Sequence, residues 1–305
     1  MRISRIALII ASAAGAVYLV PLRSSAKPES PKAVLAQSDD VKVDENVEYG
    51  SAGSQKLLMD VYRPTESKGT RPAIIYVHGG GWSGGDKRAY TGLANALVKD
   101  GYVCFWVNYR LATKDSNKYP AQIDDAQRAV RWIRANAAKY SIDPKRVGAI
   151  GDSAGGHLVA LLGTRETRNN RDVDLSSYSS KVSCVVDLYG PSDFTSSSNL
   201  VSPMASAIVI NFLGKKPEEA PALYKEASPI TWVSKTDAPF LIFHGTDDQL
   251  VPMEQSQKLY DALKSAGVEA ELVKMENDGH GFQKKENQEK FLKETLAFFK
   301  RHLKN

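Results

Sequence analysis

The stretch that most restricts the possible folds of this chain is Gly151-Asp152-Ser153-Ala154-Gly155-Gly156. It follows a short apolar run that ends at Ile150, and it precedes the helix-like run 157–162. A strand that turns directly into a helix strains the backbone of the serine, and only hydrogen side chains at Gly151 and Gly155 let the neighbouring chain pass. In this context, G-x-S-x-G predicts an exposed serine hydroxyl at a sheet edge, beside a helix N-terminus.

The rest of the chain alternates between apolar runs and helix-like segments, which predicts an α/β fold with a mostly parallel sheet and helices on both faces. The unbroken apolar run 73–77 is typical of a strand buried on both faces. The clearest helix is 123–140, where apolar residues recur at three- and four-residue steps. The other expected strands are 47–50 and 56–62 (an opening hairpin), 102–107, 146–150, 182–188, 240–243 and 268–275, and the other expected helices are 91–99, 256–266 and 291–303.

One segment breaks this alternation. Residues 191–237, after the sixth strand, are too many for a plain crossover between two strands, and they contain the apolar stretch 204–213. We interpret the segment as a small, lid-like insertion over the site. A helix packed against the sheet edge is an equal alternative.

The first 26 residues have the features of an export signal. Arg2 and Arg5 precede the apolar run 6–20, and Ser24-Ser25-Ala26 offers small residues for cleavage. The run is short for a membrane span, although an uncleaved membrane anchor is the alternative. We therefore expect a secreted or periplasmic protein, with a signal peptide at 1–26, a linker at 27–44 and one folded domain at 45–305.

Charge and cysteine content narrow the partners and the redox chemistry. The formal net charge is +5, and three of the positive charges lie in the first 26 residues. There is no basic stripe with interleaved aromatic residues, so nucleic acid is not an expected partner. Cys104 and Cys184 lie in expected strands that are not neighbours, which predicts two buried free thiols and no disulfide.

A serine hydroxyl needs a general base, usually a histidine, before it can act as a nucleophile. His280 is the favoured base because it lies in the glycine-flanked loop 277–282, directly after the last expected strand. Of the other histidines, His78 and His244 each end an expected strand and are expected to be structural. His302 is expected to face solvent, and His157 to lie too close to Ser153 in sequence to reach it.

The carboxylate that orients the base should follow a different strand. Asp247 and Asp248 both follow the strand 240–243, and the residues alone do not choose between them. Either one gives the chain order serine, acid, histidine.

Acyl transfer also needs N–H donors for the negative oxygen that develops in the transition state. One candidate donor is Ala154, which follows the serine. The others lie in His78-Gly79-Gly80-Gly81-Trp82, directly after the strand 73–77, because glycines let backbone N–H groups point into a cavity.

Together, four ordered motifs resemble those of the α/β-hydrolase esterases: H-G-G-G-W at 78–82, G-D-S-A-G-G at 151–156, H-G-T-D-D at 244–248 and H-G-F at 280–282. More narrowly they are similar to the hormone-sensitive-lipase-like group and its bacterial acetylxylan-esterase-like and feruloyl-esterase-like (BD-FAE-like) relatives, from about residue 47 to the C-terminus. The resemblance implies Ser153 as nucleophile, His280 as base, Asp248 as acid, and as oxyanion donors Gly79, Gly80 and Ala154. One departure is that only residues 27–44 lie between the expected signal peptide and the first expected strand, so we expect the N-terminal helical cap of the hormone-sensitive-lipase-like group to be missing.

The function that these observations predict is that of a serine carboxylesterase, with an acyl-enzyme intermediate and no cofactor or metal. Its expected substrates are small-molecule or polysaccharide-linked esters of short or aromatic acids, with acetyl and feruloyl groups as candidates, and Trp82 and Tyr224 are candidate substrate-binding residues. Two alternatives are an amide hydrolase resembling arylformamidases, which the leader disfavours, and an α/β-hydrolase binding module without catalytic activity. No spacing of His, Cys and carboxylate residues is typical of a metal site.

Overall fold

The structure is a computed structural model that describes residues 40–66, 69–169, 171, 173–195 and 202–304. The described residues build one eight-stranded sheet in the order β1-β2-β4-β3-β5-β6-β7-β8. β2 pairs antiparallel with both β1 and β4, and all later pairs are parallel. The predicted class, a mostly parallel α/β sheet opened by a hairpin, is confirmed.

The strands are β1 Val41–Ala52, β2 Gln55–Pro64, β3 Arg71–Val77, β4 Val103–Val107, β5 Ile142–Asp152, β6 Cys184–Leu188, β7 Phe240–Gly245 and β8 Ala270–Met275. The helices are α1 Thr91–Lys99, α2 Ala121–Ala135, α3 Ala137–Tyr140, α4 Ala154–Thr164, α5 Pro203–Leu213, α6 Pro221–Ala227, α7 Glu254–Ser265 and α8 Lys285–Leu303. Short 3₁₀ helices lie at η1 Val173–Leu175 and η3 Pro229–Trp232.

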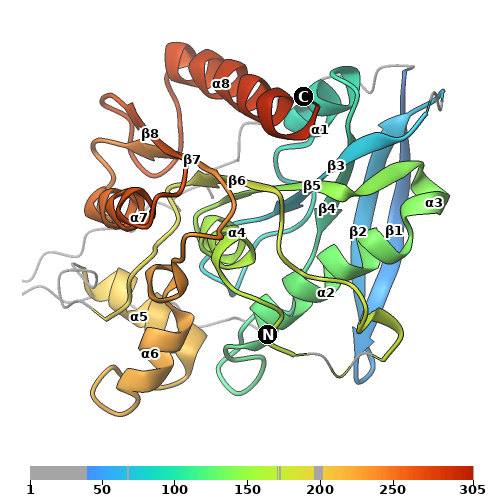
Figure 1. Cartoon of the computed structure of the whole chain (residues 1–305). Helices are drawn as coiled ribbons and strands as arrows, with labels where there is room; N and C mark the ends of the chain where they lie inside the picture. The colour runs from blue at the N-terminus through green and yellow to red at the C-terminus, as the bar shows by residue number, and fades with distance from the viewer. Residues whose placement is uncertain (1–39, 67–68, 170, 172, 196–201, 305) are drawn as a thin grey trace, which may run out of the picture. The chain divides into compact units, whose positions relative to one another are not determined.

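Helices cover both faces of the sheet because the central strands are apolar on both faces. In β3, Ile75 and Val77 belong to one hydrophobic core, with α2, α4 and α7, whereas Ile74 and Tyr76 belong to a second core, with α1 and α8. This alternation follows from the two-residue period of a strand. Figure 1 shows α1 and α8 on one side of the sheet and α2 and α4 on the other.

Two helix boundaries differ from those predicted. The expected helix 123–140 divides at Asn136 into α2 and α3, although the apolar spacing continues across the break. The terminal helix α8 begins at Lys285, before the expected start at 291. Its first residues are polar and carry no apolar period, but Asn287 Nδ2 donates to Asp278 Oδ2 at 2.8 Å and ties this turn to the preceding loop.

The first strand is longer than predicted. It begins at Val41, which is buried, so residues 41–44 of the expected linker belong to β1. Register shifts between Asp44 and Val47 and between Glu48 and Gly50 interrupt the alternation of side chains, which explains why the pattern in the sequence did not reveal the whole strand. The rest of the expected linker, and the expected signal peptide, lie outside the described residues apart from Asp40.

The two cysteines are buried free thiols, as predicted. Cys104 lies in β4 and Cys184 in β6, with β3 and β5 between them. Burial raises the pKa of both thiols, which keeps them protonated. Among the described residues, no helix is long and apolar enough to cross a membrane.

Candidate active site

Ser153 occupies the sharp turn between β5 and α4. Its φ of 53° and ψ of −117° place it in a backbone region that residues with side chains rarely adopt. A Cβ on Gly155 would lie 1.9 Å from the carbonyl oxygen of Val77, and one on Gly151 would lie 2.5 Å from the carbonyl oxygen of Gly155. Both glycines are therefore required by close backbone contacts, as the sequence predicted.

The three residues expected to cooperate lie in one chain of hydrogen bonds. Ser153 Oγ lies 2.8 Å from His280 Nε2, and His280 Nδ1 lies 2.7 Å from Asp248 Oδ2. Since an ionised carboxylate only accepts, Nδ1–H donates to Asp248 and Nε2 is free to accept the serine proton. The residues follow β5, β7 and β8, so all three lie beyond the carboxyl ends of parallel strands.

The structure chooses between the two candidate acids. Asp248 is buried, and its Oδ1 accepts the backbone N–H groups of Leu250 and Val251 at 2.9 Å each. Asp247 is exposed. Among the described residues, its side chain accepts one hydrogen bond, from the hydroxyl of the neighbouring Thr246. Burial alone would raise the pKa of Asp248, but hydrogen bonds from His244, His280 and Val251 outweigh it and hold that pKa well below its usual range.

His244 supports the acid, a role that the sequence analysis missed. Its ring is fully buried, and Nε2 lies 2.8 Å from the carbonyl oxygen of Val251 and 3.3 Å from Asp248 Oδ2. Nδ1 lies 2.7 Å from Ser256 Oγ. The signal for this role was present, because His244 lies four residues before Asp248, but a histidine at a strand end was interpreted as structural.

The expected oxyanion donors are only partly free. Within the described residues, the N–H groups of Gly80, Gly81 and Ala154 have no protein acceptor. Gly79 differs from the expectation, because its N–H donates to Asp152 Oδ1 at 3.0 Å and is engaged away from the serine. Gly81, which the sequence analysis did not select, lines the same cavity as Ser153 and Ala154.

A cavity of about 70 Å³ opens beside the serine. Most of its walls are apolar, and they include Trp82, Phe194, Ala205, Ile208, Val209 and Leu250. Three of these side chains come from α5, so the segment 191–237 forms one wall of the site. In the described part of the chain, no group of three or more His, Cys, Asp or Glu side chains is placed to hold a metal ion.

Trp82 lines the cavity and is fixed from behind. Its ring stacks on Phe212 with centroids 4.1 Å apart, and its Nε1–H donates to His157 Nδ1 at 3.2 Å. His157 Nε2–H in turn donates to the carbonyl oxygen of Ala227 at 2.7 Å. Burial lowers the pKa of His157 to about 4, so the ring is neutral and braces this wall.

Tyr224 does not line the cavity, contrary to the sequence-based expectation. Only 1% of it is exposed, and its hydroxyl donates to the carbonyl oxygen of Lys215 at 2.8 Å. An aromatic residue in an inserted helix gives the same sequence signal whether it faces a pocket or the core. The structure places this one in the core.

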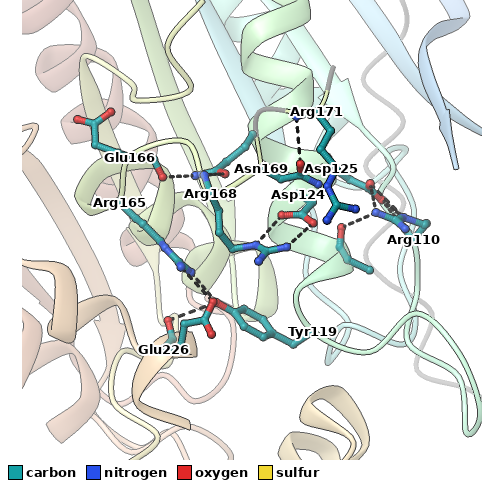
Figure 2. A network of polar contacts seen from close by, with 12 residues as sticks. Arg110, Tyr119, Asp124, Asp125, Arg165, Glu166, Arg168, Asn169, Arg171 and Glu226 are labelled. Atoms are coloured by element: carbon teal, nitrogen blue, oxygen red, sulfur yellow. Dashed lines mark hydrogen bonds and ion pairs between the residues drawn. The ribbon is translucent and has the colours of Figure 1, made fainter. Parts of the chain in front are cut away.

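Arg165, at the end of α4, ties the inserted segment to the rest of the domain (Figure 2). Its guanidinium donates to Tyr119 Oη at 2.7 Å and to Glu226 Oε1 at 3.0 Å, and it lies 4.1 Å from the ring centroid of Trp232. Tyr119 precedes α2, and Glu226 lies in α6. One buried cation therefore connects the loop before α2 with α6 and with the short helix η3.

Known proteins resemble this chain in sequence and in fold. Residues 59–263 match the BD-FAE family. Esterase LipQ of Mycobacterium tuberculosis is 32% identical over 78% of this chain and 56% of its own length. A truncated form of a carbohydrate esterase from gut microbiota is 33% identical, with a TM-score of 0.75, over 88% of this chain and 99% of that one. Butyrate-bound Est2 of Thermogutta terrifontis is 27% identical, with a TM-score of 0.72, over 85% and 93%.

The strand order and these matches identify the domain as an α/β-hydrolase fold. The chain belongs to the BD-FAE family, whose model covers most of the domain. It spans a little over half the length of the curated mycobacterial relatives that it matches.

Proposed function

We propose that this protein is a serine carboxylesterase that hydrolyses esters of short-chain or aromatic acids through an acyl-enzyme. The observation that carries the proposal is the chain of hydrogen bonds from Ser153 through His280 to Asp248. A buried carboxylate, an imidazole with a fixed tautomer and a strained serine together match what an activated nucleophile requires. A binding module without catalysis has no need of this arrangement.

Each group has a role in the proposed reaction. Ser153 Oγ attacks the ester carbonyl carbon as His280 Nε2 takes its proton, and Asp248 stabilises the imidazolium that forms. The N–H groups of Gly80, Gly81 and Ala154 donate to the negative oxygen of the tetrahedral intermediate. His280 then protonates the leaving alcohol, and a water molecule that it activates releases the acid from the serine.

Relatives support ester substrates and a link to carbohydrate. Est2 of Thermogutta terrifontis holds butyrate, and the gut-microbiota protein is a carbohydrate esterase. We therefore propose acetyl or feruloyl esters on a polysaccharide as candidate natural substrates, with small-molecule esters as the substrates for assays.

The first test compares the purified protein with its Ser153→Ala variant on p-nitrophenyl acetate. Removal of the nucleophile should lower kcat by at least about 10³-fold with the fold intact, as judged by unfolding in urea. An Asp247→Asn variant is the matched control, because this neighbouring aspartate is exposed and should be dispensable. Equal activity of Ser153→Ala and the parent would refute the proposal.

We further propose that the protein works outside the cytoplasm. The support is the sequence 1–26, with two arginines before an apolar run and small residues after it. The N-terminal sequence of protein recovered from the periplasm or medium should begin after residue 26. A mature protein that retains residues 1–26 in the membrane fraction would favour the anchor, and one that retains them in the cytoplasm would contradict export.

A further inference from the structure

The cavity beside Ser153 is small compared with the acyl groups that it could receive. Its volume is about 70 Å³. An apolar cavity of roughly 150 Å³ holds a benzene molecule, so a cavity of about 70 Å³ has about half the space that an aromatic ring needs. The three carbons that follow the carbonyl in a butyryl group fit this space. The aromatic ring of a feruloyl group does not.

The walls contributed by the main body of the domain are fixed. Trp82 is held by its stacking on Phe212 and by its bond to His157. On another side, the loop with Leu250 and Val251 is fixed because both backbone N–H groups donate to Asp248. Trp82 cannot retreat without losing its contacts with Phe212 and His157, and the loop cannot retreat without breaking the bonds that hold Asp248.

Another wall is formed by the helix α5, and its Ile208 packs against Gly81. A Cβ built on Gly81 would lie 3.0 Å from Ile208 Cγ2, so the isoleucine packs directly over this glycine. An acyl group whose carbonyl oxygen meets the N–H of Gly81 must pass beneath Ile208. Ala205 and Val209, from the same helix, line the cavity beyond it.

The cavity also offers little to a polar substituent of an aromatic acid. Gln255 is the polar lining side chain apart from Ser153, and it is buried. Its Oε1 accepts the backbone N–H groups of Ser192 and Asp193 at 2.8 Å each, and its Nε2 donates to the Asp193 carbonyl at 3.2 Å. A phenolic hydroxyl would therefore be buried against apolar carbon or against groups that are already paired, which is costly.

We infer that this cavity is an acyl pocket restricted to short aliphatic groups, and that Ile208 and Ala205 determine its length. The inference rests on the proposed esterase function and decides one of its open points, because it assigns short aliphatic rather than aromatic acids to the acyl side. An aromatic or sugar group then belongs on the alcohol side of the ester.

The test measures kcat/KM of the parent protein for p-nitrophenyl acetate, butyrate, octanoate and ferulate, which share one leaving group. We expect butyrate to exceed octanoate by at least about tenfold, and the ferulate ester to be hydrolysed more slowly still. Ile208→Ala should raise the octanoate-to-butyrate ratio about tenfold by opening the pocket. Ala205→Leu should lower the butyrate-to-acetate ratio by filling it, so the two variants test one wall in opposite directions.

Ile210→Ala is the matched control, since it makes the same truncation on the same helix at a residue that does not line the cavity. It should leave both ratios unchanged. The inference is overturned if the parent hydrolyses p-nitrophenyl ferulate as fast as p-nitrophenyl acetate, or if Ile208→Ala and Ala205→Leu give the parent's ratios. Those outcomes leave the esterase function standing, whereas activity that survives Ser153→Ala would remove the function itself.

Discussion

At the scale of single residues, the site depends on backbone positions that exclude any side chain. Ser153 has a positive φ, and it is held there between Gly151 and Gly155, whose backbones touch neighbouring carbonyl groups. A strained serine persists only where the surrounding structure determines its conformation. The reactive hydroxyl is thus placed by close packing of main chain.

The first prediction concerns this packing. Gly155→Ala should lower the free energy of unfolding by more than about 3 kcal/mol, or prevent folding, because its methyl would overlap the Val77 carbonyl. Gly84→Ala is the control, since its Cβ would lie 3.6 Å from the nearest atom, the Gly80 carbonyl oxygen, and should cost less than about 1 kcal/mol. Urea unfolding measures both. A Gly155→Ala protein as stable as Gly84→Ala would show that the turn is looser than described.

The second prediction concerns the charge of Asp248, whose pKa in the folded protein is lowered by its donors despite burial. Its contribution to stability is complete above the unfolded value of about 3.9. Below that pH the unfolded chain takes up a proton first, so the contribution is lost as the pH falls toward the folded pKa. Between pH 6 and pH 3 the parent should therefore lose about 1 kcal/mol more stability than Asp248→Asn.

Urea unfolding of both proteins at several pH values gives this difference, and the titrating groups that do not contact Asp248 are common to the pair. If the two stability curves stay parallel down to pH 3, the pKa of Asp248 is not lowered in the folded protein. His244 would then contribute no donor to the acid.

At the scale of elements, the inserted segment is held to the domain by a few strong polar contacts. Arg165 is the central one, since its side chain is 9% exposed and connects the loop before α2 with α6. Lys118 adds a bond to Asn211 Oδ1, at the end of α5, at 2.9 Å. Arg165 thus fixes α6, and Lys118 fixes α5, the helix that lines the cavity beside Ser153.

The third prediction tests this anchor. Arg165→Met should lower the free energy of unfolding by about 1–3 kcal/mol, because it leaves Tyr119 and Glu226 without their charged partner. Lys56→Met removes a cation from an exposed pair with Glu48 and should change the stability little. Equal effects of the two substitutions would mean that Arg165 contributes no more than a surface charge.

Element boundaries show what sequence patterns can and cannot convey. The strand–turn–helix around Ser153 was predictable because the glycine spacing has one steric explanation. The split at Asn136 and the early start of α8 were not, because a capping residue and a polar first turn leave the apolar period unchanged. Periodicity records which residues are buried, and helix ends are set by local hydrogen bonds.

At the scale of the whole molecule, the serine, the acid and the base were predictable from the sequence, and the residues that surround them were not. Ser153, Asp248 and His280 follow three different strands, and the resemblance to esterases singled out Asp248, which the structure confirms as the partner of His280. The cavity beside Ser153 is lined by Phe194, by α5 and by residues 250–252 and 255, which have no shared motif. Their meeting depends on how the insertion packs, and that is a property of the tertiary structure.

The same limit explains the errors at Gly79 and Tyr224. Three consecutive glycines can all offer an N–H to a cavity, and the carboxylate of Asp152 decides that Gly79 does not. An aromatic side chain in an inserted helix can face either way, and packing turns Tyr224 inward. The outcome at Gly79 depends on a contact with a residue 73 positions away in sequence.

Covalent labelling is the decisive test of whether Ser153 is an activated nucleophile. The parent protein would be treated with a fluorophosphonate at neutral pH, and the intact mass and the labelled peptide would be determined. We expect one adduct per chain, on Ser153. It should be abolished in Ser153→Ala and form much more slowly in His280→Ala. An adduct on another residue, or no adduct on a folded parent protein, would contradict it.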